Sequence, residues 1–397
     1  MPWARALSIG RPTYERLQRL REHRPAARVL AVFKQACDLV IPRNQVFSEK
    51  PGFYPGRPIH QVGRTSGHAT AGCAASHLII ALVTPQIGDG PLNIVLDGAA
   101  DPFAGVLTGA AATLSEERIE IGELRLNLAG ATVWEPRPDW DALRTRRAAI
   151  ISHLPALRDA CLRGDSSDAM TVRGDPTGTI AIGGGPADSL AIGGGPADSF
   201  LSLLRPPRPE GTIRGAILSR AAEAAQALGE GWAGDRGRLR AGATALAGLG
   251  GGLTPAGDDF LVGAMLGAWL THPTPASLCR VLADAAAPRT TILSAAFLRA
   301  AARGECSAAW HTLLAALSRR PDRADASIRS KTCQVYTAAV RSVMAHGATS
   351  GADALAGFLF VCQRQTGQRQ TLRVSKTLRV SGRDIHSKDY GDETNLS

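Results

Sequence analysis

Residues 248–259 read Gly-Leu-Gly-Gly-Gly-Leu-Thr-Pro-Ala-Gly-Asp-Asp, a glycine-rich turn that leads into an apolar helical pattern. Glycine lets a backbone turn sharply and approach a ligand without a Cβ clash. Thr254 followed by Pro255 is the pattern of a helix N-cap with proline at the first helical position. Because a helix N-terminus presents free N–H groups and the positive end of the helix dipole, this segment predicts an anion site.

The first turn of this predicted helix carries two adjacent carboxylates, Asp258 and Asp259. Carboxylates there can move a proton or bind Mg²⁺. The simpler interpretation is a well-capped helix, since an aspartate in a first turn stabilises the dipole without any ligand. The triple glycine and the second aspartate favour a functional site. Asp258 and Asp259 are therefore predicted catalytic residues, and the predicted phosphate-binding residues are Gly250, Gly251, Gly252 and Thr254.

A second segment, residues 346–357, repeats the pattern as His-Gly-Ala-Thr-Ser-Gly-Ala-Asp-Ala-Leu-Ala-Gly. Both segments contain Gly-x-Thr, a short gap and Asp-x-Leu-x-Gly. Ser350 and Asp353 match a capping box, and with Thr349 they are predicted substrate-binding residues. Two similar helix starts that face one ligand are a hypothesis, and coincidence explains the similarity equally well.

A third segment, residues 288–294, places an arginine beside several hydroxyl groups near another predicted helix start. Arg289 fits a clamp for an oxyanion or a carboxylate, because guanidinium forms charge-assisted hydrogen bonds to such groups. An exposed arginine next to ordinary caps would give the same pattern. Arg289 is nonetheless predicted to be catalytic, with substrate-binding hydroxyls on Thr290, Thr291 and Ser294.

The chain before this region has the short apolar runs of a β-rich domain. A basic segment, residues 1–27, precedes it and is predicted to hold one helix, Thr13–Arg24. Strands are expected at residues 29–33, 39–41, 78–83, 92–96, 118–121, 124–128 and 131–134, with a hairpin turn at Gly122-Glu123. The β-rich domain is predicted to span residues 28–141.

Helical periodicity dominates the second half of the chain. Residues 142–210 are predicted to hold a helix, 142–162, and a Gly/Pro-rich linker with tandem copies at 181–189 and 191–199. Neither copy is followed by the Lys and Ser/Thr of a phosphate loop. Helices are then expected at residues 213–228, 258–270, 276–287, 291–303, 308–317, 324–345 and 351–362. The predicted fold is α+β, with a helical domain at 211–362 and a disordered tail at 363–397.

Composition narrows the class of protein. The formal charge is +10, but arginines are scattered and no nucleic-acid-binding motif occurs, so a small anionic substrate is preferred to nucleic acid or a membrane. Seven cysteines without a C-x-x-C pair argue against disulfides and structural zinc. The expected location is cytoplasmic. No residue is assigned as a metal ligand, the cofactor is left open, and Mg²⁺ is one candidate.

Residues 250–263, 289–305 and 346–357 resemble, in the same order, the motifs of the AllH-type family, a subunit of oxamate carbamoyltransferase. The resemblance is strong over about residues 210–362 and weaker over 28–140. It implies an enzyme of anaerobic allantoin and purine breakdown that transfers a carbamoyl group between oxamate and phosphate, through oxalurate and carbamoyl phosphate. It also implies two other kinds of subunit.

Three functions therefore remain open. The chain is a carbamoyltransferase subunit that takes carbamoyl phosphate, phosphate or an oxamate-like anion, or it is a non-catalytic scaffold or regulatory subunit that binds a phosphate-containing ligand. A separate small-molecule enzyme that uses the same loop with a metal is the third. Reconstitution with and without this chain separates the first two, and Mg²⁺ dependence of ligand binding separates the third.

Overall fold

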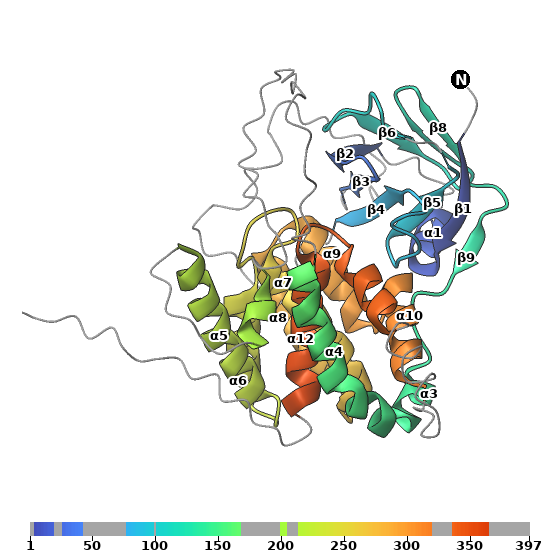
Figure 1. Cartoon of the computed structure of the whole chain (residues 1–397). Helices are drawn as coiled ribbons and strands as arrows, with labels where there is room; N and C mark the ends of the chain where they lie inside the picture. Colours follow the sequence, from blue (N-terminus) through green and yellow to red (C-terminus); the bar gives the residue numbers. More distant parts are fainter. Residues whose placement is uncertain are drawn as a thin grey trace, which may run out of the picture.

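The computed structural model of this chain describes residues 4–19, 26–42, 77–98, 101–167, 199–204, 213–319 and 336–364. The strands lie in the N-terminal part and most helices in the C-terminal part, as two bodies that meet along one side (Figure 1). The chain is therefore an α+β protein, as the sequence predicted.

The described strands form one sheet in the order β5-β4-β3-β2-β6-β7-β8-β1-β9. Because β1 also pairs with β5, the sheet closes into a barrel, and β9 extends it beside β1. The strands are β1 (Ala4–Gly10), β2 (Ala26–Val32), β3 (Ala36–Ile41), β4 (Leu78–Val83), β5 (Asn93–Leu96), β6 (Ala111–Leu114), β7 (Arg118–Ile121), β8 (Leu124–Asn127) and β9 (Thr132–Trp134). One helix, α1 (Arg11–Arg19), follows β1.

Alternation of apolar and polar residues produces these strands where the sequence shows it. In β7, Ile119 and Ile121 are buried while their neighbours are exposed, as expected for a sheet with one face on the core. The predicted hairpin is confirmed, since Ile121 pairs with Leu124 and Gly122 turns with φ 56°.

The N-terminal prediction was partly wrong. Residues 4–10 form a central barrel strand that was not predicted, and the helix expected at 13–24 begins at Arg11 and is described as far as Arg19. Strand β6 was also missed. The sheet thus begins well before residue 28.

The helical body has a helix in each predicted region, with the one predicted at 142–162 divided into α3 and α4, and it also contains α6 and two short 3-10 helices, η3 and η4. Its elements are α3 (Trp140–Thr145), α4 (Arg147–Ser167), η3 (Phe200–Leu204), α5 (Ile213–Gly231), α6 (Arg236–Leu246), α7 (Ala256–Thr271), α8 (Pro275–Ala286), η4 (Ala287–Arg289), α9 (Ile292–Ala302), α10 (Ala308–Leu317), a helix over residues 336–344 and α12 (Ser350–Arg364). Helix α6 was not predicted. Of the predicted linker, residues 168–198 and 205–210 lie outside the described residues, as do residues 324–335 of the helix predicted at 324–345 and the tail beyond residue 364.

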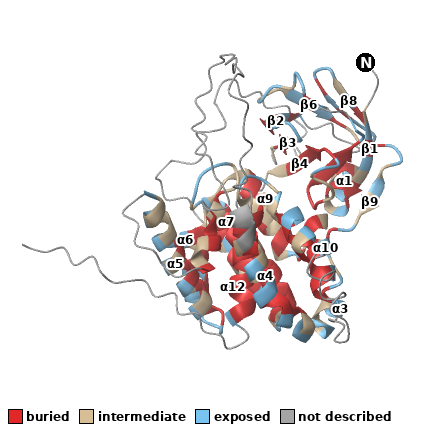
Figure 2. Ribbon diagram, in the orientation of Figure 1, coloured by how far each residue is buried: buried red, intermediate tan, exposed pale blue. Residues whose placement is uncertain are grey.

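Helices α7 and α12 lie at the centre of this body, and both are buried along most of their length (Figure 2). Glycines let them cross closely: a Cβ on Gly263 would meet the Ala354 carbonyl oxygen at 1.7 Å, and one on Gly357 would meet that of Phe260 at 1.9 Å. Gly267 lies against Val361, farther along both helices. The helices are therefore parallel, and their N-termini lie at the same end.

The barrel supports that end of the helical body. An apolar cluster joins the outer face of the barrel to the start of α9 and to Leu253, which precedes α7. Its main members are Val40, Ile79, Ala81, Val83, Leu92, Val95 and Leu293. Burial of this surface holds the glycine loop and α9 in a defined position relative to each other.

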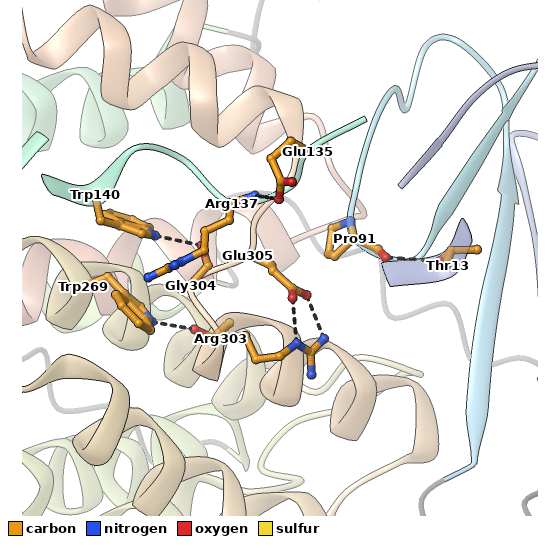
Figure 3. A network of polar contacts seen from close by, with 10 residues as sticks. Thr13, Pro91, Glu135, Arg137, Trp140, Trp269, Arg303, Gly304 and Glu305 are labelled. Carbon is orange, nitrogen blue, oxygen red and sulfur yellow. Dashed lines mark hydrogen bonds and ion pairs between the residues drawn. The ribbon is translucent and has the colours of Figure 1, made fainter. Parts of the chain in front are cut away.

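A polar network lies at the other end of α7 and α9, where α3 meets the ends of these helices, a region called here the helix junction (Figure 3). The Trp140 indole donates to the Gly304 carbonyl at 2.9 Å, and the Trp269 indole donates to the Ala301 carbonyl at 3.0 Å. Arg303 donates to both carboxylate oxygens of Glu305, at 2.6 and 2.7 Å.

Within the described ranges, no helix is long and apolar enough to cross a membrane. The five cysteines in these ranges are buried and free, and Cys73 and Cys333 lie outside them.

Candidate functional site

The glycine loop between α6 and α7 is held at Gly248 and Gly250 and is open at the two glycines that follow. Gly248 has φ 69°, and a Cβ there would lie 3.0 Å from the Arg289 carbonyl oxygen. Gly250 has φ 119°, and a Cβ there would lie 2.8 Å from the Ala256 nitrogen. At Gly251 and Gly252 an added Cβ would meet nothing within 4 Å. The loop therefore needs glycine for its path, and its tip faces open space.

The loop tip also presents backbone donors. Within the described part of the chain, the N–H groups of Gly250, Gly251 and Gly252 have no acceptor. Consecutive N–H groups at the start of a helix form a concave site that suits an anion. Phosphate binding by these glycines stays a prediction.

Asp258 ties this loop to the segment before α9. Its carboxylate accepts hydrogen bonds from the Gly248 N–H, at 3.1 Å, and from the Thr290 and Ser294 hydroxyls. Burial raises its pKa, and these three donors oppose the shift. Since hydrogen bonds to the loop and to α9 occupy this carboxylate, Asp258 is suited to positioning the loop.

The neighbouring hydroxyls complete this connection. Thr291 caps α9 by accepting the Ser294 N–H, and its own hydroxyl donates to the Leu253 carbonyl at 2.6 Å. Arg289 is exposed, and its backbone lies against Gly248. The three predicted segments are thus adjacent in space, with the Arg289 backbone beside the loop and its side chain exposed.

Two predicted caps were wrong, and their side chains have other partners. The N-cap of α7 is Pro255, without a side-chain bond, and the Thr254 hydroxyl instead lies 2.9 Å from that of Ser350. Ser350 and Asp353 do not form a capping box: the Asp353 N–H bonds the Thr349 carbonyl, and its carboxylate accepts the Phe200 N–H at 2.6 Å. Tertiary contacts replace the local ones in both cases.

The two helix starts have the same local construction. The second residue of each helix is a glycine packed on the preceding helix: a Cβ on Gly257 would meet the Leu246 carbonyl oxygen at 2.0 Å, and one on Gly351 would meet that of Val343 at 1.9 Å. Because α7 and α12 are parallel, these similar starts lie side by side. The predicted sequence repeat is therefore also a structural repeat, bridged by the hydroxyls of Thr254 and Ser350.

Equivalent carboxyl groups, Asp259 and Asp353, lie one turn before the glycines of the helix crossing. Their exposed fractions are 9% and 0%. Each has one buried oxygen, Oδ2, without a hydrogen-bond partner among the described residues. Buried polar atoms almost always have partners, so two unpartnered carboxyl oxygens at one place are unusual.

Burial dominates the ionisation of this pair. It raises the pKa of Asp353 to about 7, against the hydrogen bonds from Phe200 and Thr349. It also raises the pKa of Asp259 well above the usual range, and the charges of Asp353 and Asp258 add to the shift, whereas hydrogen bonds from Ser350 and Thr254 oppose it. Burial therefore favours the protonated form of both carboxyl groups.

One contributor was not predicted. Phe200 begins η3, inside the segment expected to be linker, and its backbone N–H binds Asp353. The apolar run Phe-Leu-Ser-Leu-Leu at residues 200–204 was the available signal. In the described ranges no three His, Cys, Asp or Glu side chains form a metal-binding group.

Together, the fold and site define an α+β protein whose central parallel helices begin side by side, with an open N–H loop above buried carboxyl groups. A sequence model of the family described as oxamate carbamoyltransferase subunit AllH matches residues 246–362, from the end of α6 into α12. The predicted resemblance is thus confirmed over the part of the chain that holds both helix starts. Searches of curated proteins and of solved structures gave no match.

Proposed function

We propose that this chain is a subunit of an oxamate carbamoyltransferase that interconverts oxalurate plus phosphate with oxamate plus carbamoyl phosphate. The family description indicates an oxamate carbamoyltransferase subunit. The reaction, its place in cytoplasmic allantoin and purine degradation and the two other subunit types are our proposal. The observation that carries it is the pairing of free loop N–H groups with unpartnered carboxyl oxygens at the starts of α7 and α12.

This combination of groups fits ligands that are both anionic and amide-like. Oxamate, oxalurate and carbamoyl phosphate each join a carboxylate or phosphate to an N–H-bearing carbonyl group. Donors at the helix start bind the anionic end, and carboxyl oxygens of Asp259 and Asp353 are available to N–H groups or to a proton. A simple phosphate site would need the loop but not the carboxyl pair.

Each group of the site then has a distinct role in the reaction. The N–H groups of residues 250–252 bind phosphate, and Arg289 adds the charge that stabilises the oxyanion of the tetrahedral intermediate. Thr290, Thr291 and Ser294 hold Asp258 and Leu253, so they position the loop. Asp259 supplies acid–base chemistry.

The test is calorimetric titration of the full chain with phosphate and with carbamoyl phosphate, followed by activity of the assembled enzyme. Arg289→Ala should weaken phosphate binding by roughly tenfold or more, because a hydrogen bond to a charged group contributes about 1.5–3 kcal/mol. Arg240→Ala, which removes an exposed arginine of α6, is the matched control and should bind as the wild type does.

Reconstitution separates catalysis from regulation. If the other subunits reach full turnover without this chain, the chain is a non-catalytic scaffold or regulatory subunit. A complete assembly that never transfers a carbamoyl group between oxamate and phosphate would refute the proposed reaction. Binding that requires Mg²⁺ would indicate the metal-dependent alternative.

A further inference from the structure

Two hydroxyl groups lie between the buried carboxyl of Asp259 and the surface. The Ser350 hydroxyl lies close enough to Asp259 to lower the pKa of that carboxyl, and its Oγ lies 2.9 Å from the Thr254 Oγ1. Both hydroxyl residues are half-buried, whereas Asp259 is 9% exposed. The hydroxyls thus stand where the open loop meets the helix starts, with the carboxyl beneath them.

Helix packing does not require this arrangement. Glycine contacts at Gly263 and Gly357 already determine how α7 and α12 cross. An apolar pair in place of Asp259 and Asp353 would avoid two buried oxygens without partners, which are costly in a protein interior. Buried polar atoms left without partners are characteristic of sites where function, and not stability, determines the residue.

The surroundings of Asp259 favour its protonated form. The ionisable groups that act on it are the acids Asp258, from its own helix, and Asp353, from α12, and no cation among the described residues offsets them. Burial adds to their effect on its pKa. A proton held there has a path toward the loop through the Ser350 hydroxyl.

We propose that Ser350 is a catalytic residue that relays a proton from Asp259 to the nitrogen that leaves during carbamoyl transfer. This inference rests on the proposed function and identifies the acid of the same site. Thr254 acts as a positioning residue, because its hydroxyl orients that of Ser350.

The step balances for hydrogen phosphate and oxalurate. A phosphate oxygen attacks the carbamoyl carbon and forms the C–O bond, and the bond from that carbon to the oxamate nitrogen breaks. The nitrogen takes the Ser350 hydroxyl proton while Asp259 passes its own proton to the Ser350 oxygen. The proton that hydrogen phosphate gives up then restores Asp259, so the products are carbamoyl phosphate and oxamate without net proton release.

The experiment measures kcat and KM of the reconstituted enzyme with oxalurate and phosphate. Ser350→Ala should lower kcat by about 100- to 10,000-fold, the usual size of general acid–base catalysis, with little change in KM. Ser350→Thr keeps a hydroxyl and should retain most of the activity. Asp38→Asn, which removes a buried barrel carboxyl, should leave kcat unchanged.

The pH profile distinguishes a relay from a structural role. An acid works when protonated, so wild-type kcat should fall as the pH rises through the pKa of Asp259, and Asp259→Asn should remove this limb together with most of the activity. If folded Ser350→Ala has an unchanged kcat, the relay is overturned. Turnover by the wild-type assembly in the same experiment would still support the proposed function. Absence of turnover in the complete wild-type assembly would overturn the proposed function and the relay with it. A KM increase alone would also overturn the relay.

Discussion

The helix junction and the paired helix starts both contain polar side chains, but they differ in how the hydrogen-bonding groups are satisfied. At the junction, the indoles of Trp140 and Trp269 each donate to a carbonyl, and Glu305 accepts two hydrogen bonds from Arg303. At the helix starts, Asp259 and Asp353 each keep one oxygen without a partner among the described residues. Satisfied networks stabilise a fold, whereas unsatisfied ones indicate a site.

The largest expected effect on the free energy of unfolding comes from a substitution at the junction. Trp269→Ala removes a side chain that is 6% exposed, stacks on Trp140 and donates to Ala301. The free energy of unfolding should fall by about 3–5 kcal/mol, as measured by urea denaturation. Trp269→Phe keeps most of the packing and should lose only about 1 kcal/mol, for the hydrogen bond.

Trp269→Ala should lower stability without changing phosphate binding. The folded fraction of this variant should bind phosphate as the wild type does, because the loop lies at the opposite end of α7. Loss of phosphate binding in proportion to lost stability would mean that the two regions do not have separate roles.

A smaller effect, which depends on pH, is expected at the helix starts. The pKa of Asp353 is raised to about 7 by burial, so the folded state binds this proton more tightly than the unfolded state does. Its contribution to stability is present at low pH and is lost as the pH rises through about 7. Between pH 5 and pH 7 the free energy of unfolding should fall by about 2 kcal/mol from this group.

Asp353→Asn checks that sign. The amide oxygen still accepts the Phe200 N–H, but the group no longer ionises, so the fall in stability over this pH range should be smaller by about that amount. Urea melts at pH 5, 6 and 7 measure it, and Asp141→Asn on the exposed face of α3 is the control. A pH dependence identical to the wild type would mean that Asp353 is ionised throughout.

The same comparison shows how far the sequence could predict the molecule. Helices α7 and α12 followed from their apolar length, and the similarity of their first turns was visible in the residues. What the sequence could not show is that they lie parallel, because this depends on Gly263 and Gly357 meeting carbonyls of the other helix. The cap at Thr254 failed for the same reason, since its hydroxyl binds Ser350, 96 positions away.

The missed elements have a common physical cause. Strand β1 carries small and polar residues, and its pairing with β5, β8 and β9 supplies the stability that its own sequence lacks. Helix α6 contains Gly237 and Gly242, which lower helix propensity. Gly242 is nevertheless required, because a Cβ there would lie 2.5 Å from the Leu228 nitrogen of α5. Tertiary contacts override local preference in both elements.

The smallest expected effect is the coupling energy of the ion pair at the junction. Arg303 and Glu305 form a two-bond ion pair, with side-chain exposed fractions of 43% and 10%. Because solvent and salt screen a partly exposed pair, a double-mutant cycle with Arg303→Gln and Glu305→Gln should give a coupling energy below about 1 kcal/mol. High salt should reduce it further.

The charges of Arg303 and Glu305 also act on Arg16, so the two single substitutions should differ in their effect on stability. The pKa of Arg16 is lowered by burial first and then by the charge of Arg303, and the charge of Glu305 opposes both. Removing Glu305 alone therefore leaves two guanidinium groups without their shared anion, and Glu305→Gln should cost more stability than Arg303→Gln. Equal costs for the two single variants would show that the junction owes its stability to the indoles and to apolar packing, with no net contribution from charge.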